Sequence, residues 1–207
     1  MSIAPSPLDA EIETFGEPAW DVARLFPDQG RWSEEDYFDL NGNLLIEFSD
    51  GVIEVLPMPS VAHQRTAGYL YNMILAYISL HGGGEVFFPP TRVRLRSGKY
   101  REPDVVLVLA EHADRFESQF IIGADLVVEV VSDDDRRRDL EVKRLEYAQA
   151  HISEYWIVDP RDAKITVLTL DGDSYAVHGE FAPGEQATSR LLPGSAVAVA
   201  EALAAKP

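Results

Sequence analysis

The sequence predicts an α/β (α+β) fold in which helices flank a mixed central sheet. Runs of β-branched and aliphatic residues at 104–109 and 125–131 have the composition of strands that are buried on both faces. Helical periodicity at 60–80, and a helix expected over 134–150, alternate with these runs. Short apolar runs on either side of a turn predict a β-hairpin near the N-terminus and another near the C-terminus. This mixture of elements is typical of a mixed sheet covered by helices.

The elements can be justified in chain order. Ser33, with Asp36 three residues later, is a capping signal that predicts a short helix over 33–40. An Asp-Gly turn at 50–51 joins the two strands of the first hairpin, and Gly82 to Gly84 end the long helix. Strands are expected at 44–48, 52–56, 85–88, 91–96, 104–109, 125–131, 154–158, 165–170 and 175–178.

The second helix is expected between two strands. Asp133, Asp134 and Asp135 give it an acidic first turn, which favours a helix N-terminus. If the strands at 125–131 and 154–158 run parallel, the helix is a right-handed crossover between them. The segment 111–123, between two strands, is expected to hold a helical turn and a loop.

Length and composition predict one domain over residues 20–207, after a Pro-, Ser- and Glu-rich tail over 1–19 that is expected to be disordered. The chain has no apolar run long enough to span a bilayer, and its start lacks the features of a secretory signal, so no membrane association is expected. Cysteine is absent, which excludes disulfides, thiolate nucleophiles and cysteine-ligated zinc, and fits a cytoplasmic location.

Two carboxylates stand inside the buried strand runs. Burial of a carboxylate is costly unless it is paired or bound to a metal ion. Asp104 and Glu129 on neighbouring strands, with the carbonyl of Val130, would form an oxygen site for a divalent cation. Such a cation can lower the pKa of bound water and stabilise charge on a phosphate.

Lys143 is the cationic residue expected to complete this site, by orienting or deprotonating the water. It lies on the helix after the Glu129 strand, with Asp139 and Tyr147 at four-residue spacing on the same face. Arg136, Arg137 and Arg138 form a basic patch nearby, which could contact phosphate or could be a solvated run.

Structural alternatives exist for each residue. Asp104 could bond loop amides at a strand start, Glu129 could pair with Arg92 or Arg94, and Lys143 could form a solvated pair with Asp139. A structural explanation must hold for both buried acids at once, so the pair favours the metal site. Glu47 and His63 are supporting candidates only, since a single helical histidine more often packs or caps.

Several of these segments together resemble a known family. They are Glu47-Phe48-Ser49-Asp50-Gly51, His63, Glu102-Pro103-Asp104-Val105, Val128-Glu129-Val130-Val131-Ser132, Arg137-Arg138-Asp139, Lys143, Tyr147 and Glu154-Tyr155-Trp156-Ile157-Val158-Asp159-Pro160. In this order they resemble the Uma-two family of restriction-endonuclease-like proteins, within the PD-(D/E)XK nuclease superfamily, over roughly Ser33 to the C-terminus. The resemblance implies a restriction-endonuclease-like sheet, cleavage of DNA phosphodiester bonds with Mg²⁺ (or Mn²⁺), and the possibility of a homodimer.

The resemblance also assigns roles. Asp104 would be the aspartate of the signature and Glu129 its second acid. Val131 stands where the signature has lysine, so the resemblance implies that Lys143 has taken over that role. Relatives tend to carry a Ser-Pro-Ser-type turn where this chain has Asp133, Asp134 and Asp135, which adds negative charge beside the site.

The leading hypothesis is therefore an endonuclease that hydrolyses DNA with a metal-activated water. Two alternatives remain at this stage. A net charge of −17 counts against general DNA binding, and with Val131 it favours a non-catalytic interaction or regulatory module on the same fold. A hydrolase of small phosphoesters is the other alternative, because an acidic surface tolerates a small substrate better than a long polyanion.

Overall fold

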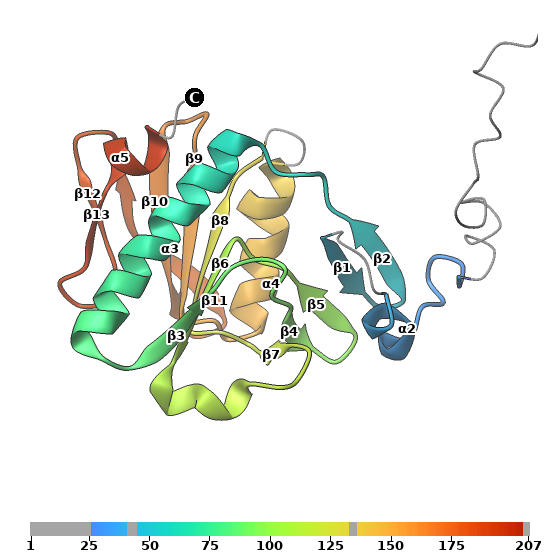
Figure 1. The fold of residues 1–207 in the computed structure, drawn as a ribbon. Coiled ribbons are helices and arrows are strands. Elements are labelled where there is room, and N and C mark those ends of the chain that lie inside the picture. Colours follow the sequence, from blue (N-terminus) through green and yellow to red (C-terminus); the bar gives the residue numbers. More distant parts are fainter. Residues whose placement is uncertain (1–25, 41–44, 133–135, 205–207) are drawn as a thin grey trace, which may run out of the picture.

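Two large sheets and a small one form the framework of the protein (Figure 1). The computed structural model describes residues 26–40, 45–132 and 136–204. The strand order is β11-β10-β9-β8-β6-β3 in the six-stranded sheet and β2-β1-β5-β4-β7 in the five-stranded sheet. The predicted tail at 1–19 and the acidic turn at 133–135 lie outside the described residues.

The six-stranded sheet is mixed, as predicted. Its strands β8 and β9 run parallel, and the other neighbouring pairs run antiparallel. The helical segment between β8 and β9 therefore connects two parallel strands, which is the condition under which the sequence implies a crossover. The strands are β3 (Gly84–Phe87), β6 (Val105–Leu109), β8 (Leu126–Val130), β9 (Glu154–Asp159), β10 (Lys164–Asp171) and β11 (Ser174–Phe181).

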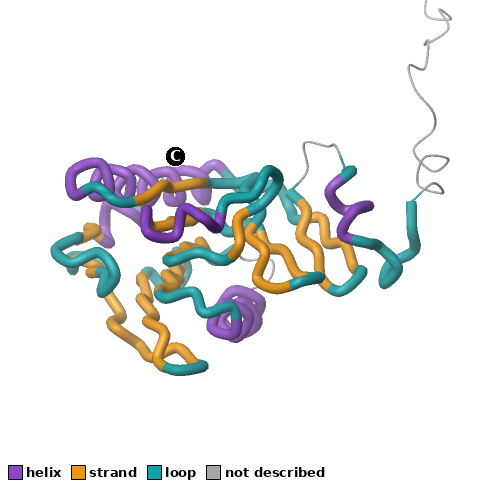
Figure 2. The backbone as a smooth tube through the Cα atoms, turned by 90° about the horizontal axis from the view of Figure 1, so that it is seen from below, coloured by secondary structure: helices purple, strands orange, loops and turns teal. Residues whose placement is uncertain are grey.

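Helices cover both faces of this sheet (Figure 2). Helix α3 (Val61–His81) packs on one face, and α4 (Lys143–Gln149), preceded by the π-helical turn η2 (Arg138–Val142), packs on the other. Leu107 and Val128 face α3, whereas Val106 and Val127 face α4, because successive side chains of a strand point to opposite faces. Full burial of each such side chain contributes about 1.5–3 kcal/mol.

The boundaries of α3 follow from its sequence. The Ser60 hydroxyl accepts a hydrogen bond from the His63 amide, and Gly82 ends the helix with a φ of 72°. The predicted stop at the glycines is confirmed. The short helix α2 (Glu34–Phe38) begins at the predicted capping box of Ser33 and Asp36.

The N-terminal hairpin belongs to the separate five-stranded sheet. Its Asp50-Gly51 turn has φ values of 49° and 84°, as an Asp-Gly turn requires. The sequence did not predict β5 and β7, because β5 is short and two of its three residues are charged. The strands are β1 (Ile46–Ser49), β2 (Val52–Val55), β4 (Val93–Arg96), β5 (Lys99–Arg101) and β7 (Ile121–Ile122).

An aromatic cluster holds α2 against this second sheet. The ring of Tyr37 stacks on Phe48 and lies against Tyr100, and all three side chains are buried. Elsewhere the chain forms the 3₁₀ helix η1 (Ala110–Arg115), strands β12 (Gln186–Thr188) and β13 (Ala196–Ala198), and helix α5 (Val199–Leu203). Among the described residues, no helix is both long enough and apolar enough to cross a membrane.

Candidate active site

The register between β6 and β8 brings the two predicted acids together. Val105 pairs with Val128 in this antiparallel ladder, so Asp104 lies directly opposite Glu129. The Val130 amide donates a hydrogen bond to Asp104 Oδ2 at 2.8 Å, which ties the start of β6 to the end of β8. The alternative was that Asp104 bonds loop amides, but the amide that it accepts from belongs to the neighbouring strand β8.

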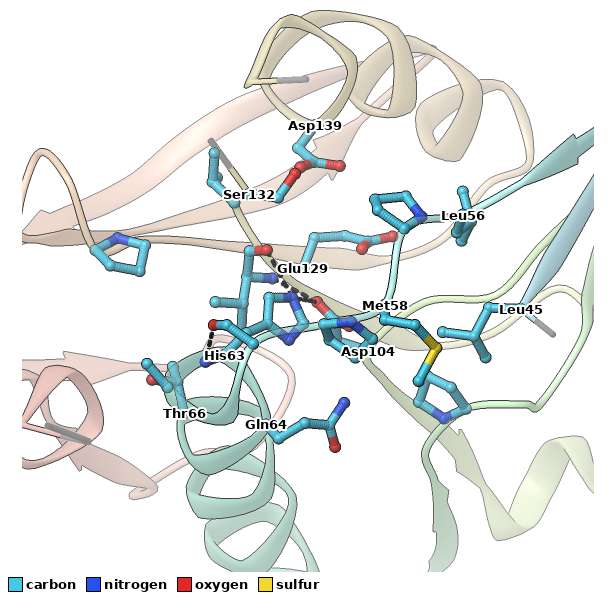
Figure 3. A pocket seen from close by; sticks show the side chains of 18 of the residues that line it. Leu45, Leu56, Met58, His63, Gln64, Thr66, Asp104, Glu129, Ser132 and Asp139 are labelled. Carbon is cyan, nitrogen blue, oxygen red and sulfur yellow. Dashed lines mark hydrogen bonds and ion pairs between the residues drawn. The ribbon is translucent and has the colours of Figure 1, made fainter. Parts of the chain in front are cut away.

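His63 contacts both oxygen atoms that were predicted as metal ligands from Asp104 and Val130. Its Nε2 lies 3.1 Å from Asp104 Oδ2 and 3.0 Å from the Val130 carbonyl oxygen (Figure 3). The Ser60 cap fixes the first turn of α3, and so places His63 over the sheet. The side chains of Asp104 and His63 are each 15% exposed, so this cluster is partly open.

The histidine carries an uncommon combination of contacts. Its Nδ1 is buried without a hydrogen-bond partner among the described residues. Burial would lower the pKa of His63, but the hydrogen bond to Asp104 and the charges of Asp104 and Glu129 outweigh it and raise the pKa. The cluster thus favours a positive charge beside Asp104 and the Val130 carbonyl.

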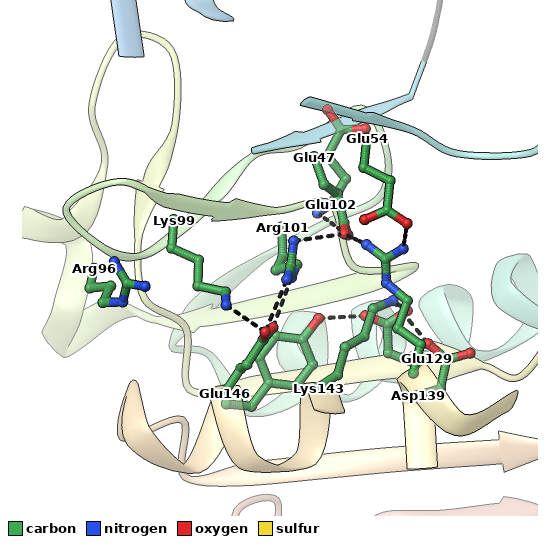
Figure 4. A network of polar contacts seen from close by, with 12 residues as sticks. Glu47, Glu54, Arg96, Lys99, Arg101, Glu102, Glu129, Asp139, Lys143 and Glu146 are labelled. Carbon is green, nitrogen blue, oxygen red and sulfur yellow. Dashed lines mark hydrogen bonds and ion pairs between the residues drawn. The ribbon is translucent and has the colours of Figure 1, made fainter. Parts of the chain in front are cut away.

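Glu129 belongs to a second, more deeply buried group of side chains, here named the closed cluster, together with Lys143, Asp139 and Tyr147. Its Oε2 is 2.9 Å from Lys143 Nζ, and its Oε1 accepts a hydrogen bond from the Tyr147 hydroxyl (Figure 4). Lys143 Nζ also lies 3.0 Å from Asp139 Oδ1. The predicted common face of residues 139, 143 and 147 is confirmed. The alternative of a solvated Lys143–Asp139 pair is wrong, because this pair is buried. The alternative that Glu129 pairs with Arg92 or Arg94 is also wrong, because its partner is Lys143.

A π-helical turn positions the lysine. The amide of Lys143 donates to the carbonyl of Arg138, five residues earlier, which widens the helix at η2. Such turns are frequent at functional sites because they redirect side chains. Asp139 lies in the widened turn, and Lys143 is the first residue of α4.

Burial and charge set the protonation of this closed cluster. Burial raises the pKa of Glu129 to about 8, because the attraction of Lys143 only partly offsets desolvation and the repulsion from Asp104 and Asp139. Burial would lower the pKa of Lys143, but Glu129, Glu47 and Asp139 raise it overall. The raised pKa favours the protonated form of Lys143, which donates hydrogen bonds.

Glu47 connects the second sheet to this site. Its fully buried carboxylate pairs with Arg101, at 3.1 Å from Nη1, and with Arg138. Arg138 also pairs with Glu54. The predicted supporting role of Glu47 stays a prediction, but the structure places the residue one ion pair away from the site.

The basic run predicted to contact phosphate is engaged in ion pairs. Arg136 pairs with Asp159 at 2.7 Å, and Arg137 pairs with Glu141 on the exposed face of the helix. Of the three arginines, Arg138 is the one that lines the cavity described below. Phosphate contact by these residues stays a prediction.

Both clusters open into one cavity of about 880 Å³. Among its lining residues are the predicted site residues His63, Asp104, Glu129, Val130, Arg138, Asp139 and Lys143. The sequence did not single out the polar lining residues Gln64, Ser132 and Arg161. It also gave no signal for an apolar wall, formed by Leu45, Leu56, Pro57, Met58, Pro59 and Pro89. A wall assembled from three separate loops has no periodicity that a sequence could show.

The donor atoms present fit a hard divalent cation. The Asp104 carboxylate and the Val130 carbonyl lie on either side of His63 Nε2, which favours the protonated form and donates to them, while Glu129 is turned toward Lys143. In the parts of the chain that the structure describes, no group of three or more His, Cys, Asp or Glu side chains is arranged to hold a metal. Mg²⁺ commonly uses only one or two carboxylates and completes its shell with water and substrate phosphate, so this donor set is sufficient in kind.

Comparison with known proteins decides the family. A family model described as "Putative restriction endonuclease", Uma2, matches residues 34–200. The chain belongs to the Uma2 family. The crystal structure of a protein from Anabaena variabilis, described as a putative nuclease belonging to DUF820, has the same fold, with a TM-score of 0.69 at 15% sequence identity. The match covers 84% of this chain and 98% of that one.

These matches confirm the family resemblance and the restriction-endonuclease-like fold expected from the sequence. No curated protein matches the chain. At the coarse level, the family description supports a nuclease.

Proposed function

We propose that this Uma2-family protein is an endonuclease that hydrolyses DNA phosphodiester bonds and requires Mg²⁺ or Mn²⁺. The observation that carries the proposal is the convergence of Asp104, Glu129 and Lys143 on one cavity, with Lys143 Nζ at 2.9 Å from Glu129. In this proposal Lys143 on α4 takes the role of the signature lysine, whose position holds Val131 in this chain.

The proposed cation would be held by Asp104 and the carbonyl of Val130, with His63 beside them. When bound, it would stabilise charge on the phosphate and make water acidic enough to attack at neutral pH. Glu129 would join the cation by giving up part of its contact with Lys143. The pKa of Glu129, raised to about 8, makes a nearby cation favourable, because a cation replaces the proton that this carboxyl would otherwise take up.

Lys143 is assigned the role of a fixed positive charge. Its ammonium has three N–H donors, and two face Glu129 and Asp139. Among the described residues these two carboxylates are its ion-pair partners, so a third donor can serve a water or a phosphate oxygen. It would orient the attacking water or stabilise the developing charge, because its raised pKa keeps it protonated.

Nicking of supercoiled plasmid tests the proposal. The wild-type protein should nick DNA with Mg²⁺ or Mn²⁺ and fail in EDTA, and Asp104→Asn and Glu129→Gln should each lose the activity. Arg137→Ala is the matched control, because its exposed pair with Glu141 lies on the same helical segment. Equal nicking by wild type and Asp104→Asn, or nicking that persists in EDTA, would contradict the proposal.

The homodimer implied by the resemblance stays part of the proposal. Sedimentation of the protein with and without a DNA fragment measures the assembly directly. If the sedimenting protein has the mass of one chain under both conditions, the dimer is excluded, and the proposed chemistry is unaffected.

A further inference from the structure

The charges around the cavity do not provide what duplex DNA needs. Proteins bind duplex DNA largely by neutralising several phosphates with lysine and arginine. Here Arg138, Lys143 and Arg136 are each engaged by two carboxylates, and the whole chain carries a net charge of −17. The cavity is lined by the carboxyl groups of Glu54, Glu102, Asp104, Glu129 and Asp139 and by the basic side chains of Arg138, Lys143, Arg161 and His63, so its positive charges are matched by carboxyl groups.

The apolar wall provides a different source of affinity. It continues from the end of β2 through the connection 56–60 to the start of α3. Met58 is 79% exposed, and Val55 and Val61 on either side of the connection are also exposed. Figure 3 shows Leu45, Leu56 and Met58 together on one side of Asp104. An exposed apolar surface of this kind next to a reaction centre marks a binding site.

An unpaired nucleotide matches both the apolar wall of the cavity and its charged side at Asp104. Its flat face is apolar and packs on such a wall, whereas the bases of a duplex are stacked on one another and are not presented. Extrusion of a base from a duplex costs a few kcal/mol, and single-stranded or mismatched DNA avoids this cost. The volume of about 880 Å³ is at the upper end of the range for cavities that enclose small organic ligands, so a nucleotide can enter.

We propose that the cavity takes an unpaired nucleotide, with its base against the wall formed by Leu45, Leu56, Pro57, Met58, Pro59 and Pro89 and its phosphate at Asp104. The preferred substrate is therefore single-stranded DNA, and duplex DNA is bound weakly. The assignment rests on the proposed nuclease function, since it names the substrate of the same site. Adaptable, polarisable Met58 suits a surface that accepts different bases.

Binding separates the inference from catalysis. Fluorescence anisotropy with a labelled 20-nucleotide single strand and the corresponding blunt duplex, with Ca²⁺ replacing Mg²⁺ to prevent turnover, gives both dissociation constants. We expect the single strand to bind at least about ten-fold more tightly, and Met58→Ser to weaken its binding at least about five-fold, as expected for the loss of one base contact. The duplex affinity should change less than two-fold.

The control is Val177→Ser on β11. Val177 is 55% exposed, and the residue is absent from the cavity lining, so the substitution removes a comparable apolar side chain elsewhere. It should leave both affinities unchanged. A duplex that binds as tightly as the single strand, or a Met58→Ser protein that behaves like Val177→Ser, would overturn the inference.

A small phosphodiester tests the proposed function separately. Hydrolysis of bis(4-nitrophenyl) phosphate by the wild-type protein with Mn²⁺ needs no base contact. If this hydrolysis and plasmid nicking are both absent, the nuclease proposal fails, and the affinity ratio still decides whether the cavity recognises unpaired DNA.

Discussion

Asp104 and Glu129 lie opposite one another on paired strands, yet their surroundings differ. Asp104 is 15% exposed, meets His63 and the end of β8, and opens to the cavity. Glu129 also lines the cavity, but its side chain is 4% exposed and meets Lys143 and Tyr147. The two acids of the candidate site therefore differ in exposure: Asp104 is the more open to a ligand, while Glu129 is engaged by its neighbours.

The difference has an energetic side. A buried ion pair contributes to stability only while both partners are present, because removal of one leaves an uncompensated group in a poorly solvated place. Glu129 belongs to such a set, and Asp104 retains partial access to water. We therefore expect substitutions at Asp104 to affect chemistry most and truncations at Glu129 to affect both chemistry and folding.

The largest expected effect is on catalysis at the open acid. Asp104→Asn keeps the size of the side chain but removes the charge that would hold the cation. Because a bound cation contributes several kcal/mol of charge stabilisation, the nicking rate should fall at least about 10³-fold. Gel assays of plasmid nicking measure the rate. An Asp104→Asn protein with a rate within ten-fold of wild type would contradict a catalytic role for Asp104.

The next effect compares the stabilities of the two truncations. Glu129→Ala removes the buried acceptor of Tyr147 and one of the two carboxylates that Lys143 meets, and it should lower the free energy of unfolding by about 3–5 kcal/mol. Asp104→Ala should cost about 1–2 kcal/mol, mainly through the unsatisfied Val130 amide. Urea unfolding in EDTA gives both values, and equal losses would remove the distinction between a closed and an open cluster.

A third prediction extends the closed cluster along α4. Glu146 bonds Arg101 and pairs with Lys99, so it ties α4 to the second sheet. Burial raises the pKa of Glu146, but the hydrogen bonds and charges of Arg101 and Lys99 lower it overall, below the ordinary value of 4.5. A carboxyl with a lowered folded-state pKa stabilises the protein above the unfolded value and loses this contribution as the pH falls.

Glu146→Gln should therefore cost about 1–3 kcal/mol at pH 7, and the gap from wild type should narrow below about pH 4.5. Thermal unfolding of both proteins between pH 3.5 and 7 follows the gap. A gap independent of pH would show that packing, and not charge, holds α4 to β5.

The smallest effect comes from the exposed counterpart of Lys143. Arg137 and Glu141 form an i,i+4 pair with side chains that are 80% and 67% exposed, on the same segment as the buried Asp139–Lys143 pair. Arg137→Ala should change the free energy of unfolding by less than about 0.5 kcal/mol and leave nicking unchanged. A larger loss, measured by urea unfolding, would mean that spacing matters more than burial in this helix.

Much of the fold was readable from local pattern. The capping box at Ser33, the Asp-Gly turn after Ser49 and the helical periodicity of α3 act within a few residues, and all three are confirmed. Strands β5 and β7 of the second sheet were not predicted. Strand β5 is short and charged, and it is stabilised by partners such as Glu146 that are distant in sequence. A strand of this kind lacks the apolar alternation from which strands are predicted.

The sequence by itself indicated the residues of the candidate site, which are two acids in buried strands and a lysine one helix later, and the order of motifs that resembles the Uma2 family. Tertiary structure alone decided how they meet. The β6–β8 register sets Asp104 opposite Glu129, the π-helical turn directs Lys143 at Glu129 and not at Asp104, and separate loops assemble the apolar wall beside them. Pattern along the chain reports local preference and burial, whereas register, helix widening and the meeting of loops depend on packing between distant segments, which no local pattern encodes.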